Sequence, residues 1–133
     1  MSKPTRTRQA TNEGGQIALQ KAQQFLATAQ EAFDSERWDS AGLNAIHAGI
    51  NAADAVLAAV AGIRSADQKH EKVSILLTQN VPSFSERQRS QLIGLLKMKN
   101  TVAYEQRLIT KVEAQRLVQA AKRFLAWAQQ NCS

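Results

Sequence analysis

The stretch that decides the fold is DSAGLNAIHAGINAADAVLAAVAG, residues 39–62, which contains no lysine or arginine although the chain has 17 of them. Its polar and apolar side chains recur at the spacing of helix faces, so we expect one long helix. The alanines and glycines between them allow neighbouring backbones to come close. We therefore expect residues 39–62 to be the central helix of a bundle.

Two rows of side chains run along this helix. The apolar row consists of Leu43, Ile46, Ile50, Leu57 and Val60. The polar row consists of Asn44, His47, Asn51 and Asp54. A helix face in water usually carries Lys, Glu or Arg, so we expect the polar row to face other parts of the protein.

Four further segments have the helical period, over about residues 16–34, 66–78, 86–105 and 110–131. Ser83 with Glu86, and Thr110 with Glu113, have the spacing of a capping box, and Gly62 is expected to end the central helix. Ser65 and Asp67 are expected to cap the third helix. No segment has strand alternation. The sequence predicts an all-α, five-helix up-down bundle over residues 16–131, preceded by a flexible basic tail, residues 1–15.

The net charge is +6, and residues 85–133 hold nine basic and three acidic side chains. This excess indicates an anionic partner such as nucleic acid or a nucleotide, the alternative being ordinary solubilising side chains on surface helices. We expect no signal peptide and no membrane span, because the N-terminal residues are basic and polar and no uninterrupted apolar run approaches the length of a bilayer. Its single cysteine, Cys132, has no partner for an internal disulfide. We expect a cytoplasmic protein without membrane association.

Phosphate-binding loops, metal-ligand spacings and nucleophile elbows are absent from the sequence, so we expect no cofactor and no metal. Two groups of polar side chains remain. In the first, His47 and Asp54 stand two turns apart on one face of the central helix. The alternative is that both are satisfied by hydrogen bonds to neighbouring helices.

The second group lies near the end of the fourth helix. Lys99 continues the apolar row of Leu92 and Leu96, so we expect a carboxylate or an anionic ligand beside it. A neighbouring face carries a cation, an amide and a phenol that suit phosphate and base contacts: Lys97, Asn100 and Tyr104. The alternative is that Lys99 extends to water and that Tyr104 packs in the core.

These two segments resemble the HEPN superfamily of small helical-bundle domains. The likeness lies in Ala45-Ile46-His47-Ala48-Gly49-Ile50 and in Lys99-Asn100-Thr101-Val102-Ala103-Tyr104, and covers about residues 16–130. Members are typically dimers, and many are metal-independent ribonucleases, often toxins, with an Arg-x4-6-His motif. The resemblance implies a bundle of HEPN type and a homodimer formed through the fourth helix and its neighbours. Apolar side chains in excess of one helix seam support the dimer: Leu92, Leu95, Leu96 and Met98.

The chain departs from the family motif at both ends. Lys99 stands where the arginine would be, and lysine offers a point charge in place of a planar fork. Tyr104 stands where the histidine would be, and a phenol with a pKa of about 10 is a poor general base at neutral pH. We therefore expect an HEPN-like RNA- or nucleotide-binding protein of a toxin–antitoxin or stress-defence system, with catalysis weakened or lost.

Two alternatives stay open. One is a metal-independent ribonuclease toxin in which Lys99, Asn100 and Tyr104 position RNA while His47 or Tyr104 moves the proton. The other is a structural or partner-binding bundle without catalysis. For binding, we expect the polar row and the segment from Lys97 to Tyr104 to meet in one cleft, where Asp54 pairs with Lys99 in the empty protein. An antitoxin-like protein is a further expected partner.

Overall fold

The structure, a computed structural model, describes residues 6–66 and 71–132. These residues form five helices and one short ribbon of two strands. In chain order the elements are β1 (Thr7–Gln9), α1 (Asn12–Asp34), α2 (Trp38–Ala61), β2 (Ile63–Ser65), α3 (Glu71–Asn80), α4 (Glu86–Tyr104) and α5 (Lys111–Asn131). The prediction of an all-α bundle with five helices is confirmed.

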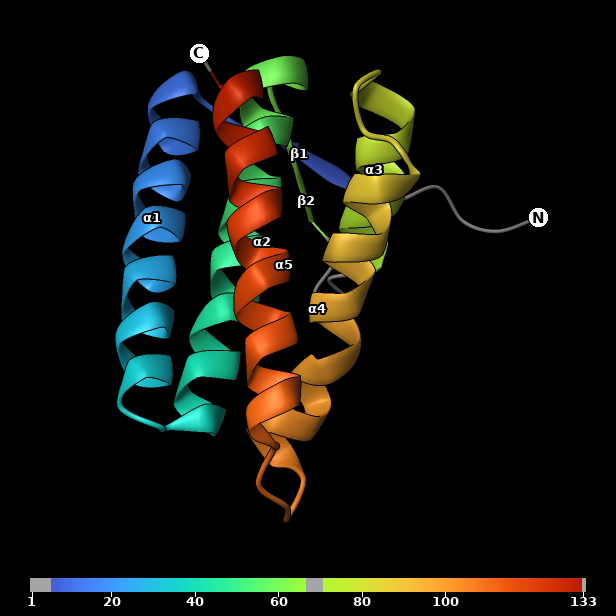
Figure 1. The fold of residues 1–133 in the computed structure, drawn as a ribbon. Helices are drawn as coiled ribbons and strands as arrows, with labels where there is room; N and C mark the ends of the chain where they lie inside the picture. Colours follow the sequence, from blue (N-terminus) through green and yellow to red (C-terminus); the bar gives the residue numbers. More distant parts are fainter. Residues whose placement is uncertain (1–5, 67–70, 133) are drawn as a thin grey trace, which may run out of the picture.

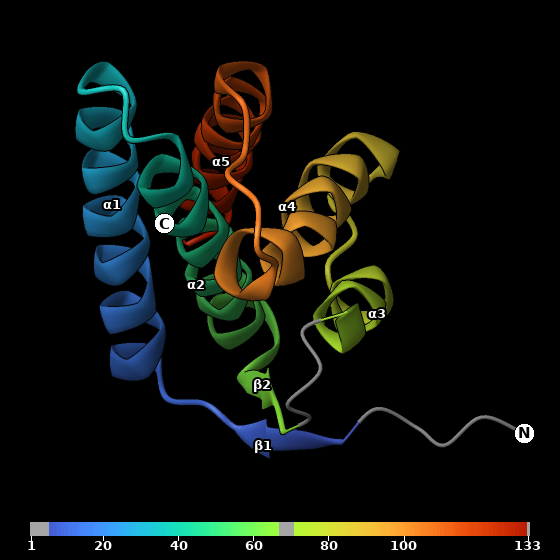
Figure 2. The ribbon, with the colours of Figure 1, turned by 90° about the horizontal axis from the view of Figure 1, so that it is seen from below.

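α2 is the helix around which the others are arranged, because it packs against α1, α3, α4 and α5 (Figure 1). Figure 2 shows α1 and α4 on its two flanks, with α5 on one side and the β1–β2 ribbon on the opposite side. By length and composition α2 would pass for a membrane span, but most of its apolar stretch is buried inside the bundle. This burial is what the core helix of a water-soluble domain requires.

Small side chains set the close approach of α2 to its neighbours. A Cβ atom on Gly49 would lie 2.6 Å from Cδ1 of Leu95, and one on Gly42 would lie 2.8 Å from Cδ1 of Ile109. Several alanines of α2 are completely buried: Ala41, Ala45, Ala48, Ala52, Ala53 and Ala55. The expectation that alanine and glycine bring partner backbones close is confirmed.

The apolar row of α2 is only partly buried. Ile46 and Leu57 are fully buried, whereas Leu43 and Ile50 are half-buried and Val60 is 41% exposed. The alanine faces occupy the sides of α2 that meet α1, α4 and α5. The row of larger side chains therefore does not coincide with the buried face.

The β1–β2 ribbon differs from the expected flexible tail and from the expected absence of strands. Its strands are antiparallel, with Thr7 opposite Ser65 and Gln9 opposite Ile63. Hydrogen bonds of 2.9 Å flank it, from the amide of Ala10 to the carbonyl of Gly62 and from Ala66 to Arg6. Strands of three residues are too short for an alternating pattern to appear in the sequence. The segment that follows α2 supplies the partner strand.

The helix ends follow the sequence with two differences. Gly62 has a φ of 63°, as expected, and the Thr110–Glu113 capping box is present. The fourth helix is capped by Ser85 with Gln88, and not by Ser83 with Glu86. Ser83 instead donates to Oδ1 of Asn131 and accepts from Nε1 of Trp127. α1 begins at Asn12, where Thr11 caps it.

The described part of the third helix begins at Glu71, and the expected cap residue Ser65 lies in β2. Asp67, the other expected cap residue, lies outside the described residues.

The core consists of two apolar clusters along α2. One joins its C-terminal half to α3, α4 and the end of α5, around Leu57, Leu77 and Phe124. The other joins its N-terminal half to α1 and the start of α5, around Ile46 and Leu95. Four side chains expected to be in excess of one helix seam pack on these clusters within the chain: Leu92, Leu95, Leu96 and Met98. Leu92 and Leu95 are buried there, whereas Leu96 and Met98 are half-buried.

Candidate functional site

The polar row of α2 forms a half-buried strip along one side of the bundle. All four of its members are partly accessible, so protein does not cover the row completely. Asn44 donates from Nδ2 to the carbonyl of Ser40, and Asn51 donates in the same way to the carbonyl of His47, both at 2.9 Å. Each amide thus bonds within α2. This local pairing lets asparagine occupy a helix interior without a partner from another element.

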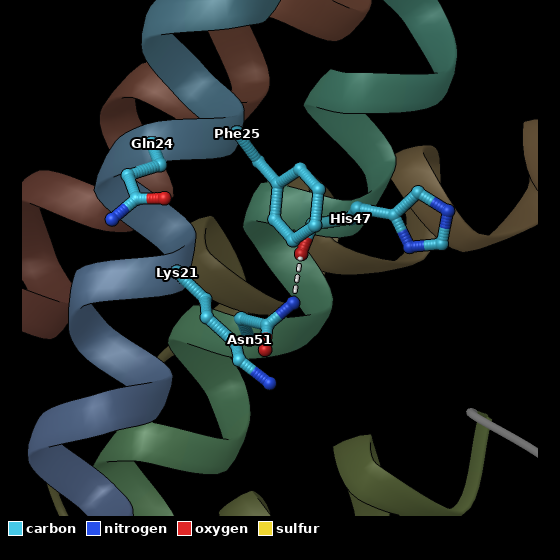
Figure 3. A pocket seen from close by; sticks show the side chains of 5 residues that line it. All are labelled: Lys21, Gln24, Phe25, His47 and Asn51. Atoms are coloured by element: carbon cyan, nitrogen blue, oxygen red, sulfur yellow. Dashed lines mark hydrogen bonds between the residues drawn. The ribbon is translucent and has the colours of Figure 1, made fainter.

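A pocket opens beside this strip, between α1 and α2 (Figure 3). Its volume is about 390 Å³, and its lining residues are Lys21, Gln24, Phe25, His47 and Asn51. The rings of Phe25 and His47 lie against each other, with their centroids 5.4 Å apart and their planes inclined by 33°. The pocket therefore combines an ammonium, two amides and two stacked rings.

The three pocket residues from α1 were missed by the sequence analysis. Lys21 and Gln24 have the composition of an ordinary exposed helix face, so no signal marks them. Phe25 immediately precedes Leu26 in the buried row of α1 and is itself only half-buried. The position of Phe25 next to the buried row of α1, and not within it, is the one feature of the sequence that could have indicated the pocket.

His47 lies in a setting that disfavours its charged form. Burial lowers its pKa, and the nearby positive charge of Lys99 lowers it further. The imidazole is therefore neutral at pH 7, with one nitrogen able to accept a proton or hydrogen bond. Lys99 is half-buried on α4 and acts on His47 across the open side of α2. The charge of Lys99 thus influences His47, and the pairing of these two residues in one site stays a prediction.

Asp54 does not pair with Lys99, contrary to expectation. Burial raises the pKa of Asp54 to about 6, while the positive charge of Arg64 on β2 lowers it in part. Among the residues the structure describes, no ion pair involves Asp54. The carboxyl group is thus desolvated without a direct counter-charge.

The antiparallel course of α4 explains this separation. Leu95 meets α2 at Gly49, and Val102 meets it at Gly42. By this register, Lys99 is level with α2 near position 45. Asp54 lies about nine residues further along α2, or roughly 13 Å at the rise of an α-helix. The charge of Lys99 therefore acts on His47, and within the described residues Lys99 forms no ion pair with Asp54.

The remaining residues of the α4 motif point elsewhere. α4 continues as a helix to Tyr104, so the side chains of Lys99 and Tyr104 diverge by about 140°. Tyr104 is 74% exposed, and Lys97 and Asn100 are exposed as well. The predicted single cleft is therefore only partly present, because Lys99 alone from this segment joins the polar row.

Metal chemistry has no obvious ligand set in the described part of the chain. Within residues 6–66 and 71–132, no three His, Cys, Asp or Glu side chains gather closely enough to hold an ion. The groups available for chemistry at α2 are thus cations, amides, an imidazole and a carboxyl group.

Comparison with known protein families places this geometry in context. Residues 16–131 match the HEPN domain, which is nearly the whole helical part of the chain. No curated protein gives a significant match. The matched region begins within α1 and ends with α5, so it contains Lys99 of α4 and every residue that lines the pocket between α1 and α2. The chain belongs to the HEPN domain family.

Proposed function

We propose that this HEPN domain binds RNA or a nucleotide on the open side of α2, with catalysis weakened or lost. The observation that carries the proposal is the pocket that brings Lys21, Phe25 and His47 together, with the charge of Lys99 near enough to lower the pKa of His47. Cations suit phosphate oxygens, and aromatic faces suit bases. The cations come from α1 and α4, and the aromatic rings come from α1 and α2.

Each residue has a role in this proposal. Lys99 and Lys21 neutralise phosphate charge from opposite flanks of α2. Phe25 offers an apolar face for a base, and His47 and Asn51 provide hydrogen bonds. Lys97, Asn100, Asn44 and Asp54 were expected at the same site. Of these, Asn44 and Asp54 lie on the polar row, whereas Lys97 and Asn100 lie on an outward face of α4.

The position of Tyr104 supports the proposal of weakened catalysis. A metal-independent ribonuclease needs a proton carrier beside the cation that holds the scissile phosphate. Tyr104 diverges from Lys99 around α4 and is exposed to solvent. Lysine also lacks the planar fork of arginine. The two replaced motif positions thus do not act on one phosphate within a single chain.

A ribonuclease remains the second candidate, because His47 is suited to replace the missing base. Its lowered pKa keeps the imidazole neutral near pH 7, which is the form that accepts a proton. A 2′-hydroxyl held next to Lys99 would lie within reach of such a base. In this candidate, His47 moves the proton and Lys99 stabilises the developing charge.

The test compares single-stranded RNA binding by Lys99→Ala and Lys122→Ala. Lys122 is an exposed residue of α5, so its loss removes the same charge away from the site. Fluorescence anisotropy should show a larger loss of affinity for Lys99→Ala. Cleavage in EDTA, measured for the wild type and for His47→Gln, separates the two candidates. Equal losses for both lysine variants would leave only diffuse electrostatics and favour a structural bundle.

The biological setting is part of the proposal. A toxin–antitoxin or stress-defence role, a cytoplasmic location and an antitoxin-like partner fit a basic HEPN domain. We also propose a homodimer, formed at the junction of α4 and α5. The large apolar side chains exposed there are Tyr104, Leu108 and Val112, and Leu108 is 82% exposed.

A further inference from the structure

Two arginines face each other on the β1–β2 ribbon. The register places Arg8 of β1 directly opposite Arg64 of β2, and both are exposed. Opposed residues of antiparallel strands have Cβ atoms about 5 Å apart, so their side chains share one face of the ribbon. Like charges in this position destabilise strand pairing. The register thus places two arginine side chains on one face of the ribbon, where their like charges oppose strand pairing.

Neither guanidinium is neutralised within the described part of the chain. Its side chains form no ion pair or hydrogen bond with Arg8 or Arg64. The positive charge of Arg64 acts on Asp54 and lowers its pKa in part, but the two form no ion pair. An external anion with several oxygens would relieve the repulsion and use both forks.

The ribbon lies at one end of the polar row. Figure 2 shows β1 and β2 on the side of α2 away from α5. Arg64 is near enough to Asp54 to affect it, and Lys99 is near enough to His47. His47 and Asp54 are about 10 Å apart along α2. One line of groups therefore runs from Lys99 through the polar row to the opposed arginines.

We propose that Arg8 and Arg64 clamp one phosphate of a single-stranded RNA whose neighbouring nucleotides lie along the polar row toward Lys99. This inference rests on the proposed function and extends it from one site to a path with two phosphate contacts. Between the contacts, Asn51 and Asp54 face the sugar and base edges. A carboxylate accepts hydrogen bonds from a 2′-hydroxyl or from the amino group of cytosine. The path favours RNA over DNA of the same sequence.

The experiment measures anisotropy of a labelled RNA of about ten nucleotides over a series of salt concentrations. The test variant is Arg8→Gln/Arg64→Gln, and the charge-matched control is Arg116→Gln/Arg123→Gln, which removes two exposed arginines from α5. The test variant should lose affinity roughly tenfold or more. Its salt slope should fall by about 0.7, as expected for one phosphate released from a single strand. The control should change affinity much less.

A second variant separates charge from geometry. Arg8→Lys/Arg64→Lys keeps both charges but loses the forks, so it should keep the salt slope and still bind more weakly. Hydrogen exchange reports the place of contact. Amides of residues 7–9 and 63–65 should exchange more slowly when RNA is bound to the wild type. Slower exchange in that ribbon is not expected for the double glutamine variant.

The outcomes distinguish this inference from the proposed function. Normal RNA binding with equal effects of the test and control variants would overturn the clamp and leave the function standing. An absence of RNA binding by the wild type would overturn both. Inorganic phosphate and a mononucleotide are tested separately, as ligands of the wild type in the hydrogen-exchange experiment. If either protects the ribbon as well as the RNA does, the arginines hold a free phosphate and the proposed strand path is wrong.

Discussion

The imidazole of His47 on α2 lies against the phenyl ring of Phe25 on α1 in a tilted contact, with the ring centroids 5.4 Å apart. This contact fixes the imidazole at the wall of the α1–α2 pocket and contributes to the burial that lowers its pKa. It also joins the helix that carries the polar row to the helix that carries Lys21. The aromatic pair therefore links the electrostatics of the site to its shape.

Replacement of Phe25 tests whether a base uses this aromatic wall. Phe25→Leu keeps an apolar side chain but removes the flat face, and base–aromatic stacking is worth about 1–3 kcal/mol per base. RNA affinity should therefore fall by about one order of magnitude or more in anisotropy titrations. Phe33→Leu, on the same helix but packed against Trp38, is the control and should leave RNA affinity unchanged.

Asp54 should make stability depend on pH. Its pKa is about 6 in the folded protein and 3.8 when unperturbed, so the folded state holds the proton more tightly. Its contribution is fully present below pH 3.8 and is lost as the pH rises through about 6. Asp54→Asn should therefore be more stable than the wild type above pH 6, by about 2 kcal/mol, and equal to it below pH 4.

Urea unfolding between pH 3.5 and 8 measures this difference, with the exposed Asp34→Asn as the charge-matched control. His47 acts in the opposite direction, since its lowered pKa adds stability as the pH rises toward 6.5. The comparison with Asp54→Asn isolates the carboxyl group because both proteins retain His47. A pH-independent difference between them would contradict a raised pKa for Asp54.

Two glycines should respond to alanine in opposite ways. Gly49→Ala would place a Cβ atom 2.6 Å from Cδ1 of the fully buried Leu95, so the protein should lose about 1–3 kcal/mol of unfolding free energy. Gly94→Ala, on α4, meets no atom within 4 Å and should gain about 0.5–1 kcal/mol from helix propensity. Thermal and urea unfolding measure both. A neutral Gly49→Ala would mean that α2 and α4 are not in the close contact described.

The exposed apolar side chains between α4 and α5 test the homodimer. Sedimentation equilibrium of the wild type should give twice the mass of one chain at micromolar concentration. Leu108→Asp should shift it toward the monomer, because a charge would be buried in the interface. Ile17→Asp changes a residue of α1 that is 47% exposed and should leave the mass unchanged. A wild-type monomer would end the proposal of a dimer.

Local patterns in the sequence were sufficient to predict the helices. The gap in charge over residues 39–62, the Thr110–Glu113 box and Gly62 each depend on residues within one element. The β1–β2 ribbon could not be predicted, since its pairing joins Thr7–Gln9 to Ile63–Ser65 and each strand is very short. Each strand is stabilised by pairing with a segment that is distant in the sequence, so neither strand can be recognised from its own residues.

The candidate site was predictable only in part. The sequence indicated His47, Asp54 and Lys99 as groups in need of partners, because charged or polar side chains occupied helix faces without other charges. The sequence did not indicate which of these three side chains lie near one another in the fold. That depends on the register of α4 against α2, which is set where Leu95 lies on Gly49. The rotation of α1 similarly brought Phe25 to His47.

The ribbon also determines which contacts first resist a pulling force on the N-terminus. Because β1 pairs with the segment that follows α2, the chain from Gln9 to Ile63 is closed into a clasped loop containing the α1–α2 hairpin. A pull on the N-terminus, from a tether or a fusion partner, is borne first by three residue pairs and not by α1. The pairing of β1 with β2 would break before the helices separate. Arg8 would then leave Arg64, while the helical bundle stayed folded.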